Sequence, residues 1–396
     1  MWRFFEEIDK RRCERVTSER FAAIVGVAES DLGETPGKSV LQLQAQAAKA
    51  ALEDAGFEKN DVDALFVAGN WAWSPNMMLA EYLGIQPKFT DGTNIGGSSF
   101  EAHVGHAAAS IRAGLFDVAL IVYGSTQRTD KSRNQPTPFV TLTEQFERPF
   151  GLPTPVGAYA LAAMRHMHQY GTTSEQLAEI AVATRKWAVM NEKAFMRDPL
   201  SIEDVLNSRY IAEPLHLLDC CLVTDGGGAV VVASAKAAAR AKKKPVWILG
   251  HGETHTHNTI ANMPDLTVTG AKQSGQKAFE MAGVRHDELD VVEIYDSFTI
   301  TVLLTLEALG FCKPGEGGHF VSGQRTAPGG AFPMNTNGGG LSYCHPGMYG
   351  IFLLIEAARQ LWGECGQRQV AEAKLALVNG TGGVLSSTST VILGRD

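Results

Sequence analysis

The stretch MNTNGGGLSYCHPGMYG, from Met334 to Gly350, has a counterpart earlier in the chain, and the two together indicate the fold class. The counterpart is NIGG, an asparagine- and glycine-rich turn that begins at Asn94. After each turn comes a segment with helical apolar spacing and then an apolar strand, FDVALIVYG in the first case and KLALVNG in the second. Strands that alternate with helices of this length predict parallel sheets covered by helices on both faces.

A second repeat lies upstream of each turn. ALEDAGFEKNDVDALFV, residues 51–67, and AFEMAGVRHDELDVVEI, residues 278–294, share a helix ending at Ala-Gly, a polar turn, an aspartate and a strand. Such self-similarity is typical of a duplicated unit. We therefore expect an N-terminal half over residues 21–245 and a C-terminal half over residues 246–396, preceded by a short amphipathic helix over residues 1–20.

An insertion interrupts the first half from about residue 126 to about residue 216. Its first part, TQRTDKSRNQPTPFVTLTEQFERPFGLPTP, is polar and rich in proline, which predicts an irregular lid-like segment. VGAYALAAMRHMHQYG and SEQLAEIAVATRKWAVMN follow with apolar residues at helical spacing. The insertion should therefore form a separate loop domain.

Composition favours a large cytoplasmic enzyme. The 396 residues are 44% apolar and 20% charged, which is ordinary for globular proteins. We expect no membrane span, because no apolar run is long enough, and no secretory signal, because the N-terminus carries charges of both signs. The six cysteines show no C-x-x-C spacing, as expected of reduced thiols. A net charge of -8 with one dense basic run, Lys242 to Lys244, argues against nucleic acid as a partner.

The glycine-rich stretch resembles the C-terminal signature of the thiolase superfamily, N-x-N-G-G-(four residues)-G-H-P-x-G. The matching residues are Asn335, Asn337, Gly338, Gly339, His345 and Pro346. The signature is broken at Tyr343-Cys344, where thiolases usually have an aliphatic residue and a glycine. The resemblance implies an α/β thiolase fold, a duplicated five-layer α-β-α-β-α arrangement with a loop-domain insertion.

Two further thiolase landmarks are recognisable, and neither keeps its cysteine. The position of the nucleophilic cysteine falls on Gly97, beside Ser98, and that of the acid/base cysteine falls on Asn379 in LALVNGTGGV. A thiolase needs a thiolate to take up the acyl group and a second group to move protons. The resemblance therefore does not extend to ordinary thiolase chemistry. Gly97 instead leaves room for substrate to approach the backbone.

A fourth landmark introduces tyrosine. VVEIYDSFTIT, residues 291–301, resembles the family's N-E-A-F motif, in which an asparagine helps to form an oxyanion hole through a water, and Tyr295 takes the asparagine's place. In this fold Tyr295, Tyr343 and His345 are expected to meet in one pocket. The pairing resembles the steroid side-chain-cleaving aldolases of the lipid-transfer-protein (sterol carrier protein x)-like branch. Taken singly, either tyrosine could be a packing residue with a satisfied hydroxyl.

The resemblance implies retro-aldol cleavage of a β-hydroxyacyl-CoA thioester, with a steroid or bile-acid side chain as the expected acyl group. Tyr295 and Tyr343 would supply the base and the acid, with His345 as third catalytic candidate. The candidates for holding the thioester are Gly97, Ser98, Asp296, Asn379 and Gly383. Two alternatives stay open: a cysteine-independent acyl-CoA acyltransferase and a non-catalytic acyl-CoA or lipid carrier. A purely structural subunit is a weaker one, because the candidate residues would then have no reason to cluster.

CoA is expected only as part of the substrate, with no tightly bound cofactor. His251, His255 and His257 have a spacing that could suggest a metal, but no cysteine or carboxylate set stands beside them, so we expect a polar binding wall and no metal. The resemblance further implies a homodimer, completed by a small zinc-ribbon and OB-fold protein.

Overall fold

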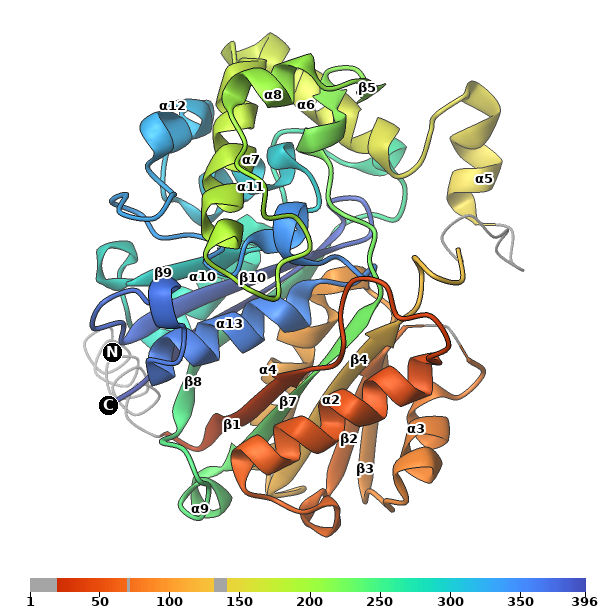
Figure 1. Ribbon diagram of the computed structural model, residues 1–396, viewed down its shortest axis with the longest axis vertical. Coiled ribbons are helices and arrows are strands. Elements are labelled where there is room, and N and C mark those ends of the chain that lie inside the picture. The colour runs from red at the N-terminus through yellow and green to blue at the C-terminus, as the bar shows by residue number, and fades with distance from the viewer. Residues whose placement is uncertain (1–19, 70–71, 132–140) are drawn as a thin grey trace, which may run out of the picture.

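The computed structural model describes residues 20–69, 72–131 and 141–396 (Figure 1). The helix expected over residues 1–20 lies outside the described residues apart from its last residue. One nine-stranded sheet, in the order β3-β2-β4-β7-β1-β8-β11-β10-β9, runs through both halves. Its strands are β1 (Ala22–Glu29), β2 (Ala64–Ala68), β3 (Phe89–Thr93), β4 (Val118–Ser125), β7 (Gly226–Ser234), β8 (Val246–His255), β9 (Val291–Ile294), β10 (Leu375–Gly382) and β11 (Ser387–Gly394).

Helices cover the sheet in three layers. The layer against the first half is formed by α2, the middle layer by α4 and α13, which touch strands of both halves, and the layer against the second half by α10 and α11 (Figure 1). With the two half-sheets between them, these layers confirm the expected five-layer thiolase arrangement. The helices outside the loop domain are α2 (Val40–Ala55), α3 (Pro75–Leu83), α4 (Ser99–Arg112), α9 (Ala235–Ala238), α10 (Ala271–Ala282), α11 (Thr299–Leu309), α12 (Gly317–Val321) and α13 (Gly350–Trp362).

The strand order shows the duplication. The first half reads β2-β4-β7-β1 and the second reads β9-β10-β11-β8, which is the same succession about the β1–β8 junction. The expectation of all-parallel sheets was wrong. β2 and β4 pair in parallel, as do β9 and β10, but the central strands pair antiparallel. For β11 the reason is local, because it follows β10 through a short turn and must run back beside it.

The insertion folds as a distinct layer above the two halves (Figure 1). Its elements are α5 (Leu142–Phe146), α6 (Val156–Tyr170), α7 (Ser174–Val189), α8 (Ile202–Asn207), β5 (Tyr210–Ala212) and β6 (Leu215–His216). Local sequence sets the start of α7, where Thr173 and Gln176 form a reciprocal capping box. The exact domain boundaries stay predictions.

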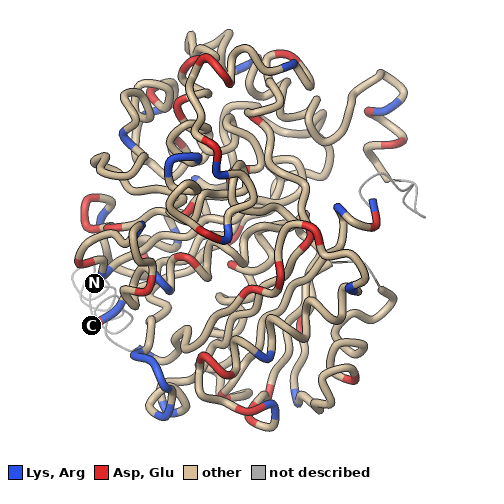
Figure 2. Tube along the Cα trace, in the orientation of Figure 1, with Lys and Arg blue, Asp and Glu red and all other residues tan. Residues whose placement is uncertain are grey.

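Charged residues of both signs are scattered along the described trace (Figure 2). In the part of the chain that the structure describes, no helix is long and apolar enough to cross a bilayer.

Candidate active site

Tyr295 stands immediately after β9, where the sheet ends, and its phenol is the centre of the candidate site. The Tyr295 side chain is buried, and its Oη lies 2.9 Å from Nε2 of His345. The backbone N–H of Tyr349 donates to the same oxygen at 3.1 Å, and the carbonyl of Gly347 lies 3.3 Å from it. The phenol thus has an imidazole as a proton partner and a backbone donor to fix its position.

The glycine-rich stretch from Met334 to Gly350 is hydrogen-bonded to the end of β9, and these bonds fix the position of His345. The side chain of Asn335 bridges the backbone N–H and C=O of Ile294, both at 2.8 Å. The Asp296 carboxylate accepts from the N–H groups of Gly340 and Leu341, at 2.6 and 3.1 Å. These bonds hold a single wide helical turn, η9 (Gly339–Tyr343), against the strand end.

Two residues of the first half fix the backbone of His345 from the other side. Its N–H donates to Oγ1 of Thr224 at 2.9 Å, and its carbonyl accepts from Nε2 of Gln127 at 2.8 Å. The loop around Gln127 is itself fixed by Asp225, whose carboxylate accepts from the backbone N–H of Arg128 at 2.9 Å. The imidazole is therefore positioned by both halves of the molecule.

Gly97 and Tyr295 occupy one space. A Cβ placed on Gly97 would lie 2.0 Å from ring carbon Cε2 of Tyr295, far inside van der Waals contact. The tyrosine ring therefore fills the room that a side chain at residue 97 would need. This packing explains the glycine and excludes a cysteine there while Tyr295 is present.

The site opens into a cavity of about 230 Å³. Its walls come from the η2 turn (Gly96–Ser98), the end of β10, the loop domain, and the segments around Tyr295 and His345. The lining residues are Gly96, Gly97, Gln127, Pro155, Tyr159, Cys221, Tyr295, Ser297, Phe298, His345, Gly347, Thr381, Gly382 and Gly383. Four of the sequence-based candidates, Gly97, Tyr295, His345 and Gly383, thus share one cavity.

Tyr343 does not line this cavity, so the structure does not bring the two tyrosines together there as expected. Its phenol is buried and donates to Oε1 of Glu29 at 2.9 Å. Arg359 donates to the same carboxylate, with Nη2 2.7 Å from Oε2, and Lys193 reaches it at 3.1 Å. The Glu29 carboxylate on β1 is a strong acceptor, and it satisfies the Tyr343 hydroxyl outside the cavity.

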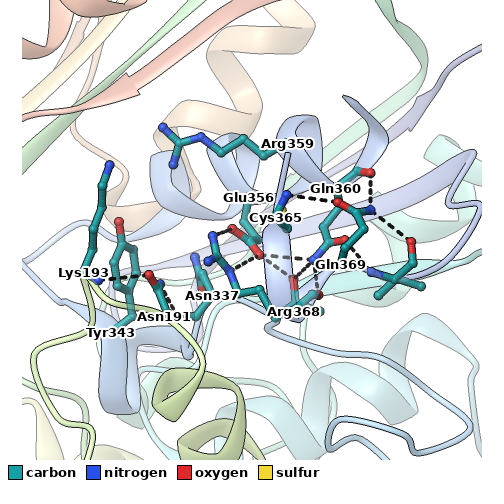
Figure 3. Close-up of polar contacts among 12 residues, drawn as sticks. Asn191, Lys193, Asn337, Tyr343, Glu356, Arg359, Gln360, Cys365, Arg368 and Gln369 are labelled. Carbon is teal, nitrogen blue, oxygen red and sulfur yellow. Dashed lines mark hydrogen bonds and ion pairs between the residues drawn. The ribbon is translucent and has the colours of Figure 1, made fainter. Parts of the chain in front are cut away.

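A second polar cluster lies beside α13, and Figure 3 shows it in the same view as Tyr343. Arg368 binds both oxygens of the Glu356 carboxylate, at 3.0 and 3.1 Å, and Gln360 joins them. Burial opposes the charge on Glu29, but the Arg359 charge and hydrogen bonds hold the pKa of Glu29 well below its usual range. The Glu29–Arg359 pair and the Glu356–Arg368 pair are thus charged anchors of the structure.

Three more candidates lie behind the cavity wall. Ser98 Oγ lies 2.7 Å from Oγ of Ser387, and Asn379 Nδ2 donates to Oγ1 of Thr390 at 2.8 Å. The Asp296 carboxylate accepts hydrogen bonds from two backbone N–H groups of η9. All three side chains are buried and absent from the lining of this cavity, and their contact with substrate stays a prediction. They hold the residues that do line the cavity, as Asn379 does when its carbonyl accepts from the N–H of Tyr295 at 2.9 Å.

Sequence reasoning missed Tyr159, a second phenol in the cavity. It comes from α6, packs on the ring of Phe298 with centroids 4.3 Å apart, and donates to the carbonyl of Gly383 at 3.2 Å. It also missed Gln127 and Cys221, which line the same cavity. The sequence feature that could have indicated Tyr159 is its phenol, which stands among alanines in the helix sequence VGAYALAAM.

Burial governs the acidity of these groups. It raises the pKa of Tyr159 to about 12 and that of Tyr295 well above 10. It also raises the pKa of Asp296 to about 7, although the two backbone N–H bonds act against this shift. Both phenols are therefore protonated at neutral pH and can donate.

The three histidines expected to form a polar wall lie away from the cavity lining. Each binds an oxygen of β11 or of the turn before it; they are His251, His255 and His257. Among the residues that the structure describes, no group of three or more His, Cys, Asp or Glu side chains could hold a metal ion.

Comparisons with known proteins agree with this geometry. Residues 252–395 match the thiolase C-terminal domain-like family. The chain is 35% identical to a steroid side-chain-cleaving aldolase of Thermomonospora curvata, covering 95% of this chain and 98% of the relative. It is 36% identical to a 17-hydroxy-3-oxo-4-pregnene-20-carboxyl-CoA lyase of Mycobacterium tuberculosis, covering 94% and 99%.

An acetyl-CoA acetyltransferase of Methanothermobacter thermautotrophicus is 31% identical, over 95% of this chain and 100% of the relative. Among solved structures, one described as an Ltp2-ChsH2(DUF35) aldolase superposes with a TM-score of 0.88 at 34% identity, covering 95% of this chain and 98% of that chain. Sequence identity and fold together show that this chain belongs to the thiolase superfamily, in its lipid-transfer-protein-like branch.

Proposed function

We propose that this chain cleaves the Cα–Cβ bond of a β-hydroxyacyl-CoA thioester by a retro-aldol reaction, giving a ketone and a shorter acyl-CoA. The observation that carries the proposal is the Tyr295–His345 pair at 2.9 Å in a cavity whose floor, Gly97, has no room for a nucleophilic side chain. A retro-aldol reaction needs no acyl-enzyme, so this loss is no obstacle. The two relatives that act as an aldolase and a CoA lyase support the same reaction class.

The reaction begins with the β-hydroxyl proton. It passes to the phenol oxygen of Tyr295 as the phenol's own proton passes to Nε2 of His345. The O–H electrons form the ketone, the Cα–Cβ bond breaks, and its electrons become a thioester enolate. Because burial keeps Tyr295 protonated, the phenol acts as a relay to the imidazole rather than as a standing phenolate.

The enolate oxygen requires hydrogen-bond donors fixed in advance. Gly96 and Gly97 on one side and Gly382 and Gly383 on the other present bare backbone to the cavity. We assign the thioester carbonyl to this glycine-lined wall.

A 17-hydroxy steroid C22-CoA thioester is the substrate that tests the proposal, since the similar lyase is named for a 17-hydroxy pregnene carboxyl-CoA. Propionyl-CoA and a 17-ketosteroid should appear by mass spectrometry without added free CoA. Products that require free CoA would indicate thiolysis and contradict the proposal.

An acyl-CoA acyltransferase is the second candidate, because one relative is an acetyltransferase and Cys221 lines the cavity. Incubation with two different acyl-CoAs would reveal acyl exchange. A carrier without activity would bind CoA esters and release no product.

We also propose a homodimer formed through β3. Among the described residues this strand is one of the two edges of the nine-stranded sheet, and its residues alternate between half-buried and exposed. Met77 and Tyr82 of the adjacent α3 are 69% and 51% exposed. Two copies of an unpaired edge can pair antiparallel about a twofold axis. Light scattering on the purified chain should give the mass of two chains.

A small zinc-ribbon and OB-fold protein is the second proposed partner. The support is the solved structure of similar fold, whose description names a DUF35 partner beside the aldolase chain. Co-purification of such a protein with this chain would test the assembly.

A further inference from the structure

We infer that Tyr159 is a further catalytic residue, the acid that delivers a proton to Cα of the thioester enolate. The inference rests on the proposed retro-aldol reaction and extends it, since the relay through Tyr295 and His345 accounts only for the proton that leaves the β-hydroxyl. A proton must also be added to Cα before the shorter acyl-CoA is complete. The role expected of Tyr343 is thus filled by a different phenol.

The position of Tyr159 fits this role. It lines the same cavity of about 230 Å³ as Tyr295, but it comes from α6 of the loop domain, whereas Tyr295 follows the sheet. Its Oη reaches the carbonyl of Gly383, in the glycine-lined wall assigned to the thioester. The two phenols therefore enter the cavity from different domains, and Tyr159 is the one placed beside the thioester wall.

The Tyr159 side chain is held by packing, and its hydroxyl donates a long hydrogen bond to the wall. The ring is 3% exposed and packs on Phe298 at 4.3 Å between centroids. Its bond to the Gly383 carbonyl is 3.2 Å long, beyond the usual range of about 2.5–3.0 Å for O–H donors, and therefore weak. A substrate atom at this wall can replace the carbonyl as acceptor.

Few other lining groups can act as the acid. The hydroxyls of Ser297 and Thr381 are aliphatic and much weaker acids than a phenol. Gln127 has no acidic proton and binds the carbonyl of His345. The remaining candidates are the thiol of Cys221 and the Tyr295–His345 pair, which holds the β-hydroxyl proton, and the experiment must separate both from Tyr159. Burial raises the pKa of Tyr159 to about 12, which keeps it protonated and ready to donate.

The proton balance closes. The β-hydroxyl proton leaves to the relay and charges His345, the Cα–Cβ electron pair enters the enolate, and Cα forms its new bond with the Oη proton of Tyr159. An enolate is a far stronger base than a phenolate, so this transfer is downhill. The proton on His345 then returns to the Tyr159 phenolate through solvent that enters as the ketone leaves.

The test is cleavage of the 17-hydroxy steroid C22-CoA thioester in deuterated water. The new deuterium enters a propionyl Cα that also bears a methyl group and a hydrogen, so the face of protonation is readable as chirality. The wild-type chain should give one stereoisomer. Tyr159→Phe, which keeps the ring packing on Phe298, should form propionyl-CoA about 100-fold more slowly or worse and give a racemic label, because solvent then protonates the enolate from either face.

Matched variants separate the explanations. Tyr343→Phe removes a buried phenol outside the cavity and should keep both the rate and the single stereoisomer. The inference is overturned if Tyr159→Phe cleaves at the wild-type rate, if it is slow but still labels one face, or if Cys221→Ala is the variant that gives the racemic label. Failure of the wild-type chain to cleave the substrate would overturn the proposed function itself.

Discussion

Tyr295 and Tyr343 are both buried phenols of the C-terminal half, and they differ in what their oxygens face. Tyr295 faces an imidazole, a backbone N–H and an open cavity, whereas Tyr343 faces the Glu29 carboxylate that Arg359 also binds. The first phenol can exchange a proton with the imidazole beside it. The second is a fixed donor to a charge. The contrast shows that burial alone does not make a tyrosine catalytic; the partner and the space beside it decide.

The largest effect on stability is expected at the Glu29–Arg359 ion pair. Glu29→Ala leaves the Arg359 guanidinium, 18% exposed, without its carboxylate, and should lower the free energy of unfolding by about 3–5 kcal/mol. Urea unfolding measures this. Turnover per folded molecule should stay near wild type, and an unchanged unfolding midpoint would contradict the anchor role.

Tyr295→Phe should lower turnover by about 100-fold or more, because the relay to His345 is lost while the ring still fills the space beside Gly97. Steady-state kinetics with the steroid thioester measures it. The matched control is Tyr343→Phe. Equal losses of turnover in the two variants would show that the two phenols do not differ in function.

The two regions should also respond oppositely to pH. The folded-state pKa of Asp296 is raised to about 7, so its contribution to stability is present below pH 3.8 and is lost as the pH rises toward 7. For Glu29 the folded-state pKa is lowered, so its contribution is present above pH 4.5 and is lost as the pH falls.

Asp296→Asn tests the pH dependence attributed to Asp296, because asparagine does not ionise. Between pH 5 and pH 7 the wild-type chain should lose about 1–2 kcal/mol more unfolding free energy than the variant. Urea unfolding at the two pH values provides the comparison. Parallel pH profiles would show that Asp296 does not titrate in this window.

The smallest effect is expected for Tyr343→Phe. Loss of one hydrogen bond to a charged carboxylate should cost about 1–2 kcal/mol of unfolding free energy and leave turnover within about twofold of wild type. Thermal unfolding and kinetics on the same preparation decide it. A large loss of turnover would indicate that Tyr343 is a catalytic residue after all.

The sequence allowed the duplication, the loop domain, Tyr295 and His345 to be placed, because short motifs and strand ends are local features. It did not allow the environment of Tyr343 to be foreseen, because Glu29 lies on the first strand and Arg359 on α13. Tyr159 carries no motif either. Its place in the cavity depends on how the loop domain packs on Phe298, which is a tertiary contact.

The shared space of Gly97 and Tyr295 also constrains how this branch can exchange reactions with its relatives. A thiol introduced at residue 97 collides with the ring, and removal of the ring alone leaves neither a relay nor a nucleophile. Each single replacement on the way to a cysteine-based enzyme therefore passes through an inactive protein. Because the acid/base cysteine is also missing, at Asn379, conversion to a cysteine-based enzyme requires at least three replacements, at residues 97, 295 and 379.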